Sequence, residues 1–279
     1  KSMKMMKKLL IFFSLLMCFG IFQANDVKAA PGIVKLTAGK TYTKYDVTGN
    51  GRKDKIIIQK EKKQDMVYRK LSVTVNGSKQ QLKAKDSHFY DVDAKLISLK
   101  NGKKFLYLYA GAENGDGYVC GIYRYVSGKW KEVVDIASVF KNYGMHLNGN
   151  IASVSGNNIK VRFYVMSWST GPSTIDYTYT YKNGTLRRTG SYGTYKAIYS
   201  YGKNTRIFYA AKSLPAYQKA NGAKKIFTVK KGGKVKILKC ALTNGKMYIQ
   251  IKYGNKTGWI KAATRTEKSV QFSNVMYAG

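Results

Sequence analysis

The chain has 279 residues, of which 44% are hydrophobic, and this content excludes a wholly disordered protein and allows one large or two ordinary domains. Lysine and arginine outnumber aspartate and glutamate by 50 to 14, so the formal net charge is +36, spread along the whole chain. A charge of this sign and size predicts an anionic partner.

Residues 1–29 have the pattern of a secretory signal peptide. Lysines precede an apolar run from Leu9 to Phe22, and a small-residue cleavage pattern ends just before Ala30. The run is short for a membrane span, and no later segment is long and apolar enough for one. We expect residues 1–29 to be removed on export, with the loss of five lysines and one aspartate. The result is a secreted or cell-wall-associated protein of net charge +32 without a transmembrane anchor, an uncleaved anchor being the alternative.

The rest of the chain is predicted to be all-β. Runs rich in Val, Ile, Tyr, Phe and Thr are separated by Asn-Gly and Ser-Gly turns, and helical periodicity is scarce. The nearest approach to a helix is Lys131 to Tyr143, which has one short apolar face. Residues 30–202 are interpreted as a β-rich repeat domain.

The first candidate site in this domain is a glycine-rich loop at residues 46–54. Oxygen-bearing groups alternate along the loop around a turn at Gly51, and Ca²⁺ prefers several oxygen ligands. Ile57 occupies the position of the bidentate glutamate of an EF-hand. The alternative is a turn whose Asp and Asn side chains hydrogen-bond their own backbone. The predicted metal ligands are the side chains of Asp46, Thr48, Asn50 and Asp54 and the main-chain carbonyl of Arg52.

Three stretches of the repeat domain share one order of strand, loop, strand, tight turn and strand. Their turn glycines recur at a nearly regular spacing, and glycine supplies the positive φ of tight hairpin turns. Each unit is therefore predicted to be a four-stranded meander, in a propeller-like or a sandwich-like arrangement. The turns are Asn76-Gly77, Ser127-Gly128 and Asn183-Gly184, and further hairpins at Asn101-Gly102 and Gly156-Asn157 lead into the second and third units.

The loop at 46–54, together with the strand that follows it, resembles the D-x-N-x-D-G-x-x-D repeats of FG-GAP and VCBS-type proteins. The blades of those proteins are similar to the blades of integrin α-chain propellers. The direct match covers only this loop and strand, and the periodicity extends the resemblance over residues 40–190. Thr48 and Asn50 replace residues that are usually carboxylates or amides in the family. The resemblance implies propeller-like blades and a calcium-binding loop.

No catalytic constellation is recognisable, so we predict that the protein is not an enzyme. Cys120 lies in a strand pattern without the helix N-terminus that lowers a thiol pKa, and His88 and His146 lie far apart in the sequence without zinc-site spacing. Cys120 and Cys240 are expected to pack as small apolar groups, with a disulfide as the alternative. The alternative function is a carbohydrate-active or wall-modifying enzyme with an unrecognised carboxylate pair, for which the candidates are Asp91, Asp93, Glu113 and Asp116.

A domain boundary is predicted near residue 203, and residues 203–264 are interpreted as a second domain. Phe227 to Leu238 reads as strand, basic glycine turn and strand, and Tyr248 to Ile260 reads as a hairpin that ends in Gly-Trp-Ile. These segments resemble the bacterial SH3-like (SH3b) family over residues 206–262, although the first strand departs from the family's usual pattern. Trp259 is expected in the core of the small barrel. The tail, residues 265–279, is expected to be partly disordered or packed along this module.

The resemblance to SH3-like modules implies attachment to the cell wall or an adaptor role beside another protein. The basic charge independently suits anionic wall polymers. We therefore expect an exported binding protein whose partner is an anionic cell-wall polymer or peptidoglycan, with a carbohydrate or a protein as further candidates. Nucleic acid fits the charge and the 23 tyrosines, but the predicted export argues against it.

Overall fold

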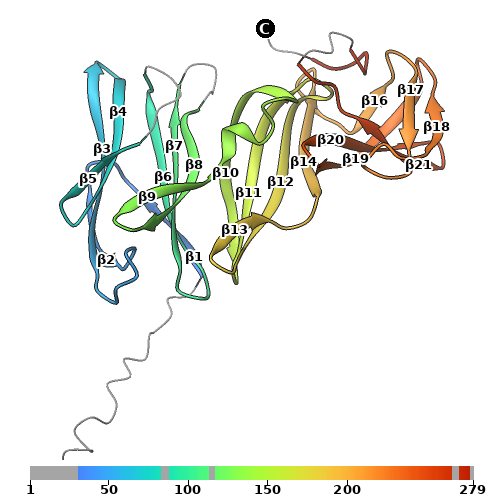
Figure 1. The fold of residues 1–279 in the computed structure, drawn as a ribbon. Helices are drawn as coiled ribbons and strands as arrows, with labels where there is room; N and C mark the ends of the chain where they lie inside the picture. The colour runs from blue at the N-terminus through green and yellow to red at the C-terminus, as the bar shows by residue number, and fades with distance from the viewer. Residues whose placement is uncertain (1–30, 83–87, 113–116, 266–269, 277–279) are drawn as a thin grey trace, which may run out of the picture.

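The computed structural model describes residues 31–82, 88–112, 117–265 and 270–276, and these confirm the predicted all-β fold. The strands form three antiparallel sheets, none of which closes on itself. The three sheets stand side by side, and the C-terminal strands extend the third sheet away from the other two (Figure 1). Within these ranges, no helix is long and apolar enough to cross a membrane. The predicted signal peptide lies outside the described residues.

The first sheet is a four-stranded meander in the order β2-β3-β4-β5. The residues between β2 and β3 form the predicted calcium loop, and Asn76-Gly77 makes the turn between β4 and β5 with positive φ at both residues. Its strands are β2 (Thr41–Tyr45), β3 (Asp54–Gln64), β4 (Val67–Val75) and β5 (Ser78–Gln81).

The second sheet has five strands in the order β1-β6-β7-β8-β9, so the first strand of the described chain lies at the edge of the second meander and not in the first. Turns at Asn101-Gly102 and Ser127-Gly128 join β6 to β7 and β8 to β9. Its strands are β1 (Gly32–Leu36), β6 (Asp91–Ser98), β7 (Lys104–Gly111), β8 (Gly117–Val126) and β9 (Lys129–Asp135).

The third sheet continues from the third unit into the C-terminal part of the chain, in the order β10-β11-β12-β14-β19-β20-β21-β17-β18. Three short strands pair outside this path, β13 with β12, β15 with β14 and β16 with β19. The strands from the third unit are β10 (Gly144–Ser155), β11 (Asn158–Ser167), β12 (Gly171–Lys182), β13 (Thr185–Arg188), β14 (Tyr192–Ser200) and β15 (Lys203–Asn204). The C-terminal strands are β16 (Ile207–Tyr209), β17 (Leu214–Tyr217), β18 (Lys225–Val229), β19 (Lys234–Thr243), β20 (Lys246–Tyr253) and β21 (Lys256–Lys261).

The three predicted repeat units are found as three meanders, β2 to β5, β6 to β9 and β10 to β13. The turn glycines Gly77, Gly128 and Gly184 have φ between 78° and 88°, the left-handed conformation that the turn requires. The helical candidate from Lys131 to Tyr143 is instead strand up to Asp135, followed by one short 3-10 turn from Ile136 to Ser138. Val134 pairs with Ile122 of β8, and β-branched side chains favour such a pairing over a helix.

The second sheet is buried on both faces. Along β7, Leu106 and Leu108 belong to the core shared with the first sheet, whereas Phe105 and Tyr107 belong to the core shared with the third sheet. This is the alternation expected of a strand between two apolar layers. The first sheet therefore has one apolar face, which packs on the second sheet, and one face that no other sheet in the described part of the chain covers.

Neighbouring sheets are also joined by polar contacts between corresponding turns and edges. The Gln80 amide donates to the Trp130 carbonyl at 2.8 Å and accepts from the Trp130 N–H at 2.7 Å, which links the edges of the first and second sheets. The Arg124 guanidinium donates to the carbonyl of the turn residue Gly184 at 2.8 Å, which links the second sheet to the third. These hydrogen bonds hold neighbouring sheets together through main-chain groups that are not paired within their own sheet.

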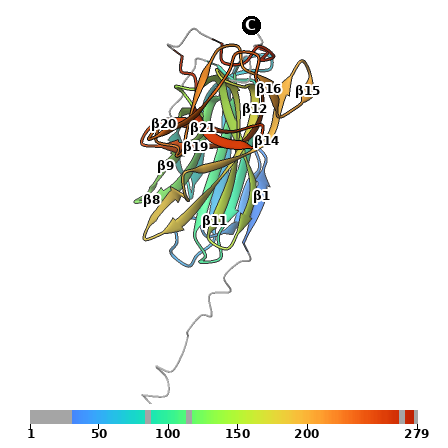
Figure 2. The same cartoon turned by 90° about the vertical axis from the view of Figure 1, so that its right-hand side faces the viewer.

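The third sheet crosses the predicted boundary at residue 203 without a break. On β14, Tyr192 and Gly193 pair with Ala241 and Cys240 on β19, so the third unit and the C-terminal strands share one sheet (Figure 2). The Gly193 backbone lies so close to Tyr177 that a Cβ atom there would be 2.4 Å from the ring. The junction therefore requires glycine for close approach and not for its φ.

The part of the tail that the structure describes, residues 270–276, packs along the C-terminal strands. Phe272 is fully buried and forms a bridge with Ala210, and the Ser273 N–H donates to the Tyr209 carbonyl at 2.9 Å. This agrees with the packed alternative for this part of the tail.

Candidate functional site

The loop at residues 46–54 folds around its own carboxylates. Asp54 is buried, and its Oδ2 atom accepts hydrogen bonds from the N–H groups of Val47 at 2.7 Å and Thr48 at 2.9 Å. Its Oδ1 atom accepts from the Asn76 amide at 2.6 Å, which ties the loop to the turn between β4 and β5. The Asp54 side chain thus satisfies donors that would otherwise be unpaired in the interior.

Asp46 holds the glycine turn in the same way. Its two oxygens accept from the N–H groups of Gly49 at 2.6 Å and Gly51 at 2.8 Å, and the Asn50 side chain accepts from the Arg52 N–H at 2.8 Å. Both glycines have positive φ. This is the hydrogen-bonded turn that the sequence offered as the alternative to a calcium loop.

The five predicted calcium ligands are brought together, but in this conformation they do not fit a cation well. Backbone N–H groups occupy the carboxylate oxygens, and the Thr48 hydroxyl lies 3.3 Å from an oxygen of each carboxylate. Lys104 lies near the loop. The pKa of its ammonium is lowered by burial, and the Asp46 carboxylate offsets only part of this effect. Among the described residues, no three His, Cys, Asp or Glu side chains are grouped as a metal site. Calcium binding stays a prediction that requires the loop to rearrange.

Within the described residues, Cys120 and Cys240 form no disulfide, and each is buried in the large apolar core. Burial raises the pKa of the Cys240 thiol to about 12, against the lowering effects of hydrogen bonds with Tyr177 and Gly193. A thiol in this environment is protonated and a poor nucleophile near neutral pH. The structure therefore agrees with the expectation of two thiols that pack as apolar groups.

Two of the four candidate carboxylates lie on β6. Asp93 forms an ion pair with Lys95 at 2.7 Å, and the Lys95 ammonium also contacts the Asn150 side chain of β10. Asp91 is exposed, and Glu113 and Asp116 lie outside the described residues. Asp93 is therefore held by an ion pair within the fold.

A lysine-rich surface, which the sequence reasoning did not identify, covers the outer face of the C-terminal strands. Val235, Ile237 and Ile251 point into the core, so the residues between them point outward. Lys236 and Lys252 are direct cross-strand neighbours, flanked by Ile207 on one side and Thr257 on the other. Within the part of the chain described, neither lysine forms an ion pair.

An aromatic stack borders these lysines. Tyr192 lies on Trp259 with ring centroids 5.5 Å apart and planes 20° apart, and the Lys239 ammonium lies 4.3 Å from the Tyr192 centroid and 5.7 Å from the Trp259 centroid. Tyr192 is 58% exposed. One row across the strands consists of Lys239, Gln250 and Trp259. The Lys236 and Lys252 row is the next row on the same face of the sheet. We call Lys236, Lys239, Lys252, Tyr192 and Trp259 the basic-aromatic face.

Trp259 is buried, but it lies on the outer side of the sheet in a small cluster with Ala241 and Tyr248, and Ile260 occupies the main core instead. The expectation that Trp259 is a core residue is therefore confirmed, although its cluster is the small one on the outer side of the sheet. Tyr192 covers the indole from outside, and this long-range contact is invisible in the local Gly-Trp-Ile pattern.

The charge around this face is of one sign. No Asp or Glu occurs in the sequence between Asp176 and Glu267, and the Asp176 carboxylate is paired with Arg162 through contacts of 2.8 and 3.0 Å. This absence of acidic residues, together with lysines at alternating strand positions, was the sequence signal for the face. The basic residues of the same stretch are Lys182, Arg187, Arg188, Lys196, Lys203, Arg206, Lys212, Lys219, Lys224, Lys225, Lys230, Lys231, Lys234, Lys236, Lys239, Lys246, Lys252, Lys256, Lys261 and Arg265.

Neither a protein-family model, nor a curated protein, nor a solved structure matches this chain. The likenesses to FG-GAP or VCBS-type repeats and to SH3-like modules therefore stay resemblances, and the function is argued from the site alone.

Proposed function

We propose that the protein is an exported, non-catalytic binding protein of the bacterial cell envelope, and that its basic-aromatic face contacts an anionic cell-wall polymer or peptidoglycan. The observation that carries this proposal is the pair Lys236 and Lys252, which lie opposite each other with no acidic residue in the surrounding stretch of chain. Like charges placed in this way oppose folding, so their presence is best explained by an anionic partner.

A polymer fits this face better than a small anion does. One exposed ion pair contributes about 1 kcal/mol or less, so a single phosphate on one lysine is held weakly. A chain of repeated anionic units contacts several lysines at once, and its later contacts form at high effective concentration. Tyr192, exposed beside Lys239, offers a flat ring on which a sugar can lie.

We propose further that residues 40–190 are propeller-like blades in an open stack, and that residues 203–264 form an SH3-like module joined to them through β14 and β19. In this account the repeat region supports the module and the module attaches the protein to the wall. A protein partner for the same face is the other candidate within this function.

The proposal is tested by co-sedimentation of residues 30–279, which include every residue described, with purified cell walls. Walls are compared before and after extraction of their anionic polymers. Binding to intact walls that is lost after extraction supports anionic polymer, and binding that survives extraction supports peptidoglycan. Failure to sediment with either preparation at physiological salt contradicts the proposal.

The same samples test the enzymatic alternative. Release of soluble sugar or peptide from peptidoglycan, abolished by Glu113→Gln or Asp116→Asn, would establish the protein as a wall-modifying enzyme. The proposal expects no release.

A further inference from the structure

The first sheet lies at the opposite end of the molecule from the C-terminal strands (Figure 1). Its outer face holds a second feature, a polar hollow. Ile56, Ile58 and Val73 point toward the second sheet, so the alternate residues of the same strands point away from it. The hollow has a volume of about 320 Å³. Its lining residues are Gln59, Lys60, Glu61, Lys70, Ser72, Lys79 and Gln81.

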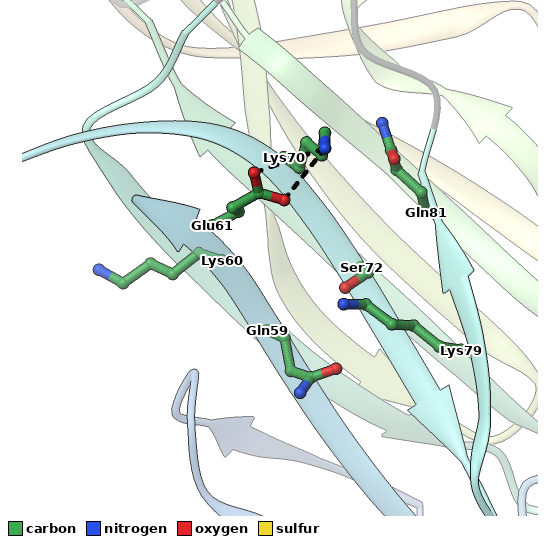
Figure 3. A pocket seen from close by; sticks show the side chains of 7 residues that line it. All are labelled: Gln59, Lys60, Glu61, Lys70, Ser72, Lys79 and Gln81. Carbon is green, nitrogen blue, oxygen red and sulfur yellow. Dashed lines mark hydrogen bonds and ion pairs between the residues drawn. The ribbon is translucent and has the colours of Figure 1, made fainter. Parts of the chain in front are cut away.

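Strand register places the polar groups in ordered rows. Gln59, Ser72 and Gln81 are direct neighbours across β3, β4 and β5, and Glu61 lies opposite Lys70 in the next row. Figure 3 shows Glu61, Lys70 and Gln81 at one end of the hollow and Gln59 and Lys79 at the other, with Lys60 directed away from them.

Two of these side chains, Gln59 and Glu61, are held in position by bonds to neighbouring side chains of the first sheet. The Gln59 carbonyl oxygen accepts from the Thr74 hydroxyl at 2.9 Å, which leaves the amide NH₂ group for a ligand. The Glu61 carboxylate is bonded to Lys70 at 3.2 Å and to Arg69 Nε at 2.6 Å. Hydrogen bonds from Lys70 and Arg69 lower the pKa of Glu61, so it stays ionised as an acceptor.

Two further groups have no partner of their own. Ser72 is only 4% exposed and forms the floor of the hollow, and its hydroxyl makes no hydrogen bond within the described residues. In the same part of the chain, the Lys79 ammonium forms no ion pair and no hydrogen bond. The Ser72 hydroxyl is not itself sealed from solvent, so it and the Lys79 ammonium are both available to a ligand in the hollow.

We propose that this hollow binds one unit of an acidic saccharide, a sugar that carries a carboxylate or a phosphate. Amide, hydroxyl, carboxylate and ammonium groups match the hydroxyls of a sugar ring, and Lys79 matches one negative charge. The described residues that line the hollow include no aromatic or aliphatic side chain, whereas protein interfaces and most small-molecule sites have an apolar centre. The proposal goes beyond the basic-aromatic face and does not depend on it.

The test is an amide-resolved NMR titration of residues 30–279 with glucuronate, glucose 6-phosphate, glucose and inorganic phosphate as separate probes. We expect shift changes in residues 59–61, 70–72 and 79–81 with glucuronate or glucose 6-phosphate, at concentrations at least tenfold lower than with glucose or phosphate. Tighter binding of glucuronate identifies a carboxylate as the charged group of the ligand, and tighter binding of glucose 6-phosphate identifies a phosphate.

Lys79→Gln and Ser72→Ala are each expected to weaken binding of that sugar by about tenfold, which corresponds to about 1.4 kcal/mol. Lys55→Gln is the matched control, because Lys55 is exposed on the same strand as Gln59 and lies outside the hollow. The affinity of the Lys55→Gln variant for the acidic sugar should equal that of the wild type. The proposal is overturned if neither acidic sugar shifts these residues, or if phosphate alone shifts them at the same concentration. It is also overturned if Lys55→Gln loses as much affinity as Lys79→Gln and Ser72→Ala. Each of these outcomes holds whatever the wall-sedimentation result.

Discussion

Lys236 and Lys252 lie directly opposite each other on the neighbouring antiparallel strands β19 and β20, and both side chains are exposed. Like charges directly opposite each other destabilise a sheet, whereas a pair of opposite charges in the same place stabilises it by roughly 0.2–1 kcal/mol. Lys252→Glu replaces this repulsion with attraction.

We therefore expect Lys252→Glu to raise the free energy of unfolding by about 0.5 kcal/mol, measured by urea denaturation. Lys129→Glu, an exposed lysine on β9 of the second sheet, makes the same change of charge far from the pair. An equal gain in Lys129→Glu would show that net charge, and not the cross-strand pair, is responsible.

Gly193 is where the third unit and the C-terminal strands meet. A Cβ atom at this position would lie 2.4 and 2.6 Å from atoms of the Tyr177 ring and 2.9 Å from Cys240 Sγ. Gly193→Ala is expected to lower the free energy of unfolding by about 1–3 kcal/mol through overpacking. Thr194→Ala, at the exposed neighbouring position, should change it by less than about 0.5 kcal/mol. Equal stability of the two variants would contradict the close packing of β14 on β19.

The sequence predicts the meanders well because their signals are local. A turn glycine needs positive φ whatever surrounds it, so Gly77, Gly128 and Gly184 mark hairpins that the structure contains. The short apolar run of β7 likewise predicts a strand, although it does not show which neighbouring sheet each face contacts.

Pairings between distant segments are not predicted in this way. Nothing near β1 indicates that it joins β6 instead of β2, and nothing near Tyr192 indicates that β14 continues into β19 or that its ring covers Trp259. Such contacts depend on the shape of the assembled sheets. The basic-aromatic face was missed for this reason, although the absence of acidic residues between Asp176 and Glu267 was visible.

Alkaline pH should destabilise the fold. Burial raises the pKa of the Cys240 thiol from 9.0 to about 12 and that of the Tyr179 hydroxyl from 10.0 to about 12. These groups hold their protons more tightly in the folded state than in the unfolded state. Their contribution to the free energy of unfolding is therefore complete below the unfolded pKa values and is lost as pH rises from about 9 to about 12. Thermal unfolding should thus occur at a lower temperature at pH 10.5 than at pH 8.5, in buffers of equal ionic strength. An unchanged midpoint would contradict the burial of these groups.

The carboxylate of Asp54 should stabilise the protein with or without calcium. Asp54→Asn weakens the hydrogen bonds from Val47 and Thr48 and from the Asn76 amide, with an expected loss of about 1.5–3 kcal/mol of unfolding free energy. Asp65→Asn, an exposed aspartate in the turn after β3, is the control and should have little effect.

Calcium itself is tested on the wild type. If the loop binds Ca²⁺, the midpoint of thermal unfolding is higher with millimolar Ca²⁺ than with chelator, and Asp46→Asn removes the difference. Equal midpoints would contradict the calcium prediction and leave the hydrogen-bonded turn as the role of the loop.

The central claim is that the basic-aromatic face attaches the protein to anionic wall polymer, and the most direct measurement compares two double variants of residues 30–279 in wall co-sedimentation. Lys236→Glu with Lys252→Glu removes the lysine pair, and Lys55→Glu with Lys129→Glu makes the same change of net charge on the first and second sheets. We predict that the first variant loses wall affinity by about tenfold or more and that the second stays within about twofold of the wild type at physiological salt. Equal binding by the two variants, whether both are retained or both lost, would contradict the claim.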